Sequence, residues 1–211
     1  SHQKASNATE SKYFDREILP VEGKNAEGIN EMVIADEGIR FDASLDKLAG
    51  LNPVTEGGVI TAGNASQITD GAAAVMICND AGLKKIQSNP RAEIVSISVV
   101  GDDPVFMLTG PIPASHKALE AANLTIEDID LYEVNEAFAP VPLAWAHDLK
   151  ADKSKLNVNG GAMALGHPLG ATGAKLMTTL LHEMERREST YGLQAICEGG
   201  GTANATIIKR I

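Results

Sequence analysis

A glycine-rich stretch around a single histidine constrains this chain more than any other part of its sequence. Residues 157–175 read NVNGGAMALGHPLGATGAK, with five glycines around His167 and a proline directly after it. Glycine allows positive φ, whereas proline fixes its own φ and restricts the residue before it. We therefore expect His167 to lie on a stiff loop. Apolar residues recur at helical spacing over residues 174–188, which predicts that this loop opens onto an amphipathic helix.

The rest of the chain alternates between strand-like and helix-like patterns. From residue 91 onward we expect strands at 91–100, 130–134, 193–197 and 203–209, and helices at 113–122, 140–150 and 174–188. Such alternation indicates an α/β fold with a mixed, mainly parallel sheet and helices on both faces. The last two strands are joined by a short glycine turn and should be antiparallel. A further apolar run at residues 72–78 predicts a buried strand, with Cys78 in the core.

The composition narrows the class of protein. The chain has 211 residues, of which 44% are hydrophobic, enough for the core of one or two domains. Its formal net charge of −10 argues against nucleic acid as a partner. Two cysteines do not make a disulfide framework, so we expect a reducing, cytoplasmic setting. We find neither a membrane span nor a signal peptide, and a start at Ser1 indicates a fragment or a processed product.

Three short motifs carry residues suited to chemistry. An asparagine opens NEAF at Asn135, a histidine is central in GHP at His167, and a cysteine opens CEGGG at Cys197. Two further blocks, TAGNAS at 61–66 and GPIPA at 110–114, lie upstream of them. In their residues, order and spacing these motifs resemble the thiolase family, and the resemblance covers essentially the whole chain.

The resemblance implies a domain layout. Residues 1–62 correspond to part of the thiolase loop domain, residues 63–90 to the tail of the N-terminal domain, and residues 91–211 to the C-terminal domain. The expected fold is then a thiolase-like layered α/β fold, one half of an αβαβα sandwich.

The resemblance also implies an activity and roles for four residues. Thiolases cleave a 3-ketoacyl-CoA with free coenzyme A, or condense two acyl-CoA molecules in reverse, so coenzyme A is a substrate and no bound cofactor or metal is expected. His167 would activate the nucleophile and donate to a thioester oxygen, for which a neutral imidazole is suited. Cys197 would be the second acid/base at C2, in surroundings that favour the thiolate. Asn135 would hold a water in one oxyanion hole, and the backbone N–H of Gly199 would donate in the other.

Four more residues match positions that bind substrate in thiolases. Arg40 falls near the adenine end of coenzyme A, and a solvated surface arginine explains it equally well. Ser66 matches a position against the pantetheine arm, where the alternative is an ordinary turn serine. Met107 and Phe138 match positions lining the acyl pocket, and a core role is their alternative.

One element of the family pattern has no counterpart here. Thiolases carry the acyl group on a cysteine in the N-terminal half, and nothing in this sequence matches that motif. We therefore interpret the chain as the C-terminal half of an acyltransferase that is active only with a complementary N-terminal half, in an enzyme expected to form homo-oligomers. The alternative is a non-catalytic thiolase-like module that binds acyl-CoA or a partner. A β-ketoacyl synthase would need a second catalytic histidine, and His147 lies in no such motif.

Overall fold

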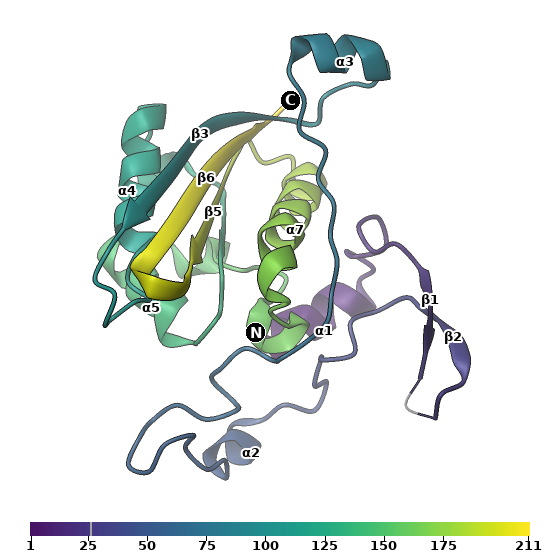
Figure 1. Ribbon diagram of the computed structural model, residues 1–211, viewed down its shortest axis with the longest axis vertical. Coiled ribbons are helices and arrows are strands. Elements are labelled where there is room, and N and C mark those ends of the chain that lie inside the picture. Colours follow the sequence, from purple (N-terminus) through teal and green to yellow (C-terminus); the bar gives the residue numbers. More distant parts are fainter. Residues whose placement is uncertain (26) are drawn as a thin grey trace.

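One four-stranded mixed sheet organises the second half of the chain in the computed structural model, which describes residues 1–25 and 27–211 (Figure 1). Its strands lie in the order β3 (Ala92–Gly101), β6 (Thr202–Arg210), β5 (Tyr191–Cys197) and β4 (Leu131–Val134). The α/β class, the mixed sheet and the antiparallel final pair are thus confirmed. The expected predominance of parallel pairs is wrong, because only β4 and β5 pair in parallel. β6 turns back through the glycines and inserts between β3 and β5, so it is antiparallel to both.

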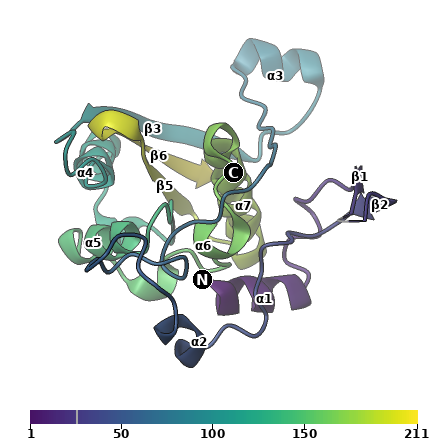
Figure 2. The same cartoon turned by 60° about the horizontal axis from the view of Figure 1, so that its bottom comes forward.

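Helices cover both faces of this sheet, as expected. In both views α4 (Pro111–Ala122) and α5 (Pro140–Asp148) lie on one side of the sheet and α7 (Thr172–Arg187) on the other (Figures 1 and 2). Side chains alternate along a strand, so each strand contributes to two cores. Leu193 packs with the α4 and α5 side, whereas Ile208 packs with Leu180 and Met184 of α7.

The larger core is centred on Trp145 of α5, which is fully buried. Its ring meets that of Tyr132 edge-on, with the centroids 5.2 Å apart. Its indole Nε1 donates a hydrogen bond of 2.8 Å to Ser115 Oγ on α4. A buried indole needs such a partner, so this contact fixes how α5 lies against α4.

Strand β3 turns its serines inward. Ser96 and Ser98 are buried against α4, where their hydroxyls donate to the carbonyl oxygens of Ala118 and Ala114. A small hydroxyl allows the helix to lie close to the strand and satisfies itself on the helix backbone. The apolar side chains of Ile97, which lies between them, and of Val99, which follows, remain largely exposed on the other face.

The first 90 residues form separate short elements and extended segments. These elements are α1 (His2–Glu10), which contacts α6 (Ala162–Leu165), the hairpin of β1 (Val21–Lys24) and β2 (Asn30–Val33), α2 (Leu45–Ala49) and α3 (Asp80–Ile86). Within the described residues, no helix is both long enough and apolar enough to cross a membrane.

The buried strand expected at residues 72–78 is wrong. This segment is extended but unpaired, and it passes α7 in both views (Figures 1 and 2). Met76 and Ile77 are about three-quarters exposed, and Cys78 is exposed where a core position was expected. An apolar run becomes a buried strand only where neighbouring strands pair with it, and no strand of the described residues does so.

Candidate active site

Two contacts with one neighbouring segment hold the loop that carries His167. Gly166 has φ 81°, and a Cβ at this position would lie 2.3 Å from Thr69 Oγ1, so only glycine fits there. The backbone N–H of His167 donates to the carbonyl oxygen of Gln67 at 3.2 Å. This loop is therefore packed against the 66–71 segment.

Both ring nitrogens of His167 have partners. Nε2 lies 3.1 Å from Nδ2 of Asn135, and Nδ1 lies 2.6 Å from Oγ1 of Thr172. Since the Asn135 amide donates to Nε2, Nδ1 carries the proton and donates to Thr172. Burial, and then the charge of Lys175, lower the pKa of His167 below 6.5. The imidazole is consequently neutral at pH 7.

Cys197 lies at the end of the strand next to the one that leads to Asn135. The Asn135 N–H donates to the carbonyl oxygen of Ala195 at 3.0 Å, and neighbouring strands are about 4.8 Å apart. Because β4 and β5 are parallel, their carboxyl ends meet at one edge of the sheet. Burial, together with the charge of Glu198, raises the pKa of the Cys197 thiol. The surroundings thus favour the protonated thiol and not the thiolate that the sequence suggested.

A cavity of about 620 Å³ opens beside His167 and is lined by residues 66–71 and 167–171. Ser66 therefore faces the same space as His167. Its backbone N–H donates to the carbonyl oxygen of Ala137 at 3.0 Å, and Ala65 forms an isolated antiparallel bridge with Phe138. The structure thus brings Ser66 into the cavity wall and Phe138 next to that wall.

Of the eight predicted site residues, Ser66 and His167 alone line this cavity within the part of the chain that the structure describes, and Arg40, Met107 and Gly199 lie elsewhere. Arg40 is exposed, and its backbone N–H donates to Nδ1 of His2 at the start of α1. Met107 is half-buried in the loop between β3 and α4. Gly199 follows β5, and its carbonyl oxygen accepts from the Thr202 hydroxyl at 3.1 Å.

Sequence reasoning missed several side chains that support the histidine loop. Thr172 lies five residues after His167, within the same glycine-rich motif, and this spacing was the available signal. Lys175 donates to the carbonyl oxygen of Leu165 and lies 3.9 Å from Asp36. Gln67 Nε2 donates at 2.8 Å to the carbonyl oxygens of both Gly38 and Met163, and no local pattern predicts such a long-range clamp.

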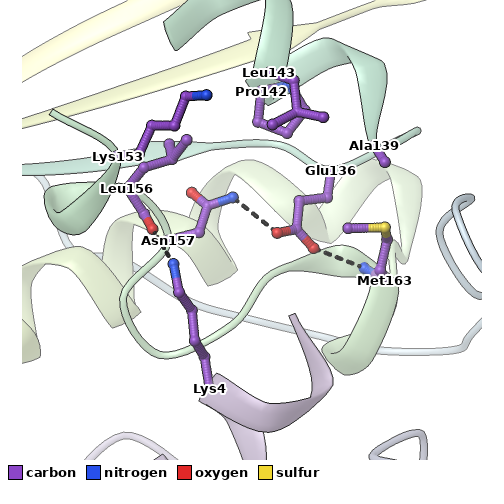
Figure 3. Close-up of a pocket in the computed structure, with 9 residues that line it drawn as sticks. All are labelled: Lys4, Glu136, Ala139, Pro142, Leu143, Lys153, Leu156, Asn157 and Met163. Carbon is purple, nitrogen blue, oxygen red and sulfur yellow. Dashed lines mark hydrogen bonds between the residues drawn. The ribbon is translucent and has the colours of Figure 1, made fainter. Parts of the chain in front are cut away.

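Glu136, the acidic residue of NEAF, also supports the histidine loop, through hydrogen bonds to residues that precede His167. A smaller cavity of about 210 Å³ lies beside it (Figure 3), lined by Lys4, Glu136, Ala139, Pro142, Leu143, Lys153, Leu156, Asn157 and Met163. The Glu136 carboxylate accepts from the Asn157 side chain and from the Met163 N–H, each at 3.1 Å. A Cβ on Gly161 would lie 2.3 Å from the Glu136 carboxyl carbon, which explains the glycine. Glu136 therefore ties the end of β4 to the segment that leads to His167.

Two family matches decide the affiliation. Residues 88–210 match the thiolase C-terminal domain, and residues 1–81 match the thiolase N-terminal domain. The chain belongs to the thiolase family.

Named relatives agree with this family. A steroid 3-ketoacyl-CoA thiolase of Mycobacterium tuberculosis is 54% identical over 211 residues, which cover all of this chain and 50% of the relative. A 3-ketoacyl-CoA thiolase of Photorhabdus laumondii is 47% identical over 216 residues, covering 100% of this chain and 56% of the relative. The chain thus spans about half the length of the curated relatives it matches.

Solved thiolases have the same fold. The acetyl-CoA acetyltransferase of Bacillus anthracis superposes with a TM-score of 0.94 at 42% identity, over 100% of this chain and 54% of the other. Human mitochondrial 3-ketoacyl-CoA thiolase, solved in complex with CoA, gives a TM-score of 0.91 at 42% identity, over 100% and 52%.

Proposed function

We propose that this chain supplies the acid–base half of a thiolase, which transfers an acyl group between coenzyme A thioesters. The observation that carries this proposal is the contact of Asn135 with His167 at the carboxyl end of β4, directly beside the strand that ends in Cys197. Ligands of α/β sheets bind at such carboxyl ends. In this proposal the nucleophilic cysteine belongs to a complementary N-terminal half.

The proton steps follow from the states of the side chains. Neutral His167 takes the thiol proton of the nucleophile, whose sulfur attacks C3 of a 3-ketoacyl-CoA. The C2–C3 bond breaks, its electron pair goes to C2, and Cys197 protonates C2 with its thiol proton. The resulting thiolate then takes the proton of an incoming coenzyme A thiol, which attacks the acyl-enzyme and releases the nucleophile as a thiolate that recovers its proton from His167. The raised pKa of Cys197 supports a thiol that starts as the acid.

The surrounding residues have supporting roles. Oδ1 of Asn135 is buried without a protein partner among the described residues, which suits an amide that holds a water in an oxyanion hole. Ser66 in the cavity wall would meet the pantetheine arm, with Phe138 and Met107 at the acyl group, Arg40 at the adenine end and the Gly199 N–H in the second hole. Coenzyme A as substrate is supported by the solved human relative, which holds CoA.

The decisive experiment joins this chain to the N-terminal half of a relative by co-expression. We expect the pair to cleave acetoacetyl-CoA or a longer 3-ketoacyl-CoA, whereas the 211-residue chain alone neither becomes acylated nor turns over. Cys197→Ala should still be acylated by a simple acyl-CoA, because only the C2 proton shuttle is lost. His167→Ala should be slowed in acylation itself, by about 10²–10⁴-fold.

Intact-mass measurement of the acyl-enzyme burst separates these steps. Equal acylation of the two variants would overturn the division of roles between His167 and Cys197. Acylation of Cys78 or Cys197 in the isolated chain, together with turnover, would overturn the half-enzyme proposal. Binding of acyl-CoA by the joined halves without turnover would instead favour the non-catalytic module.

A further inference from the structure

Two buried oxygen atoms on neighbouring strands lack hydrogen-bond partners. They are Oε2 of Glu133 on β4 and Oε1 of Gln194 on β5, both without a partner among the described residues. Glu133 is 2% exposed and Gln194 is 5% exposed. The two residues are direct register partners in the parallel β4–β5 pair, so their side chains leave the same face of the sheet about 4.8 Å apart. A buried polar atom without a partner is costly, and two side by side require a common explanation.

The face in question lies under α7. Leu131, two residues before Glu133, packs with Leu180 and Met184 of that helix. The charged groups that act on Glu133 are Lys175 and Glu183 of α7, Lys4 of α1, Glu17 after α1 and Glu136 after β4. Three of these five groups are acidic, so the surroundings give an ionised Glu133 little support. Burial, and then the charge of Glu136, raise the pKa of Glu133 well above its ordinary value of 4.5.

We propose that Glu133 keeps its proton at neutral pH and donates it to Oε1 of Gln194, which holds β4 and β5 in the register that presents Asn135 and Cys197 at one edge of the sheet. A single acid proton satisfies both oxygens, whereas an ionised carboxylate would place two acceptors against each other. Glu133 and Gln194 are positioning residues in this arrangement, since they act on the site only through the strands. The claim that this strand register serves the active site rests on the proposed function. The hydrogen bond between Glu133 and Gln194 does not.

The first test is the titration of the Glu133 carboxyl carbon by ¹³C NMR in the full chain. We expect a neutral carboxyl at pH 7. In Gln194→Leu the pKa of Glu133 should fall, because the acceptor that stabilises the neutral acid is gone. If the amide were rotated so that Nε2 donated to an ionised Glu133, the same variant would raise that pKa. An ionised Glu133 at pH 7, or a raised pKa in Gln194→Leu, overturns the proposal.

The second test uses Glu133→Gln, whose amide N–H replaces the acid proton without titrating. A raised folded-state pKa means that the folded protein holds a proton which the unfolded chain releases above about pH 4.5. The wild-type folding equilibrium constant should therefore fall about tenfold more per pH unit above that value than the constant of Glu133→Gln. Glu17 titrates in both proteins and cancels in this difference. The exposed Glu127→Gln is the control and should follow the wild type; parallel profiles for wild type and Glu133→Gln would contradict the proposal.

A third measurement reads the effect on the site. Hydrogen exchange of the Asn135 N–H, which donates to Ala195, should be unchanged in Glu133→Gln and at least tenfold faster in Glu133→Leu. Equal protection in both variants would remove the positioning role. None of these measurements requires turnover, so failure of this inference is distinguishable from failure of the proposed function.

Discussion

At the scale of single residues, the site depends on how the neighbours of His167 set its charge and tautomer. Its two ring nitrogens are held by Asn135 and Thr172. Its charge state is set by burial and by Lys175, which itself lies near Asp36. Each of these influences can be changed one side chain at a time.

Lys175→Met should raise the pKa of His167, because removing a positive charge makes the imidazolium less unfavourable. The increase should be partial, since burial is the larger cause and stays. Titration of the ring protons by NMR measures the shift. Lys24→Met on the exposed hairpin strand is the matched control and should leave the midpoint unchanged. An unchanged or lower midpoint in Lys175→Met would contradict this account of the histidine.

Thr172→Val should release Nδ1 of His167 from its partner, whereas Thr172→Ser should keep the bond. A lost hydrogen bond to a half-buried group such as His167 costs about 0.5–1.5 kcal/mol, so the free energy of unfolding should fall by that amount in the valine variant. Ring ¹⁵N shifts should show a single Nδ1–H tautomer in wild type and Thr172→Ser, and a mixture in Thr172→Val. A single unchanged tautomer in the valine variant would show that Asn135 alone sets it.

At the scale of elements, the sequence predicted those whose own residues determine them. The helix expected at 113–122 is α4, whose proline start and left-handed Asn123 end are local signals. The strand expected at 72–78 was wrong because pairing depends on neighbours that no local pattern contains. The predominance of parallel pairs was wrong for a related reason, since strand order decides where β6 inserts. The sequence also could not predict which face of β3 is buried, because the residues that point inward are serines.

The packing of α5 against α4 gives a test at this scale. Trp145→Ala removes a fully buried indole and should lower the free energy of unfolding by about 3–5 kcal/mol. Ser115→Ala removes the acceptor of the indole N–H, together with the bond that the Ser115 hydroxyl donates to the Pro111 carbonyl oxygen, and should cost about 1–3 kcal/mol. Urea unfolding followed by far-UV circular dichroism compares the two without needing tryptophan fluorescence. Equal losses in both variants would indicate that the hydrogen bond, and not packing, dominates this contact.

At the scale of the whole molecule, motifs indicated which residues meet but not how they are supported. Resemblance to thiolases named Asn135, His167 and Cys197, and the structure brings Asn135 to His167 at the edge where Cys197 ends β5. The raised pKa of Cys197 was not predictable, because it depends on burial by residues distant in sequence. The roles of Arg40 and Gly199 stay predictions, since they concern a ligand and not a contact within the chain.

The exposed apolar side chains of the whole molecule lead to a prediction about assembly. Met76 and Ile77 on the unpaired segment are about three-quarters exposed, and Ile97 and Val99 of β3 are about 60% exposed. Apolar surface of this kind promotes association. We expect the chain to bind an apolar dye and to associate as its concentration rises, and co-expression with an N-terminal thiolase half to suppress both effects. A double substitution on the unpaired segment, Met76→Lys with Ile77→Lys, should reduce association of the isolated chain. It should also weaken binding of the N-terminal half. The exposed Leu143→Lys on α5, which lies on the other side of the sheet from α7, is the control. Light scattering after size exclusion measures both states; a 211-residue monomer that stays monodisperse, binds no dye and melts cooperatively would contradict the need for a complementary chain.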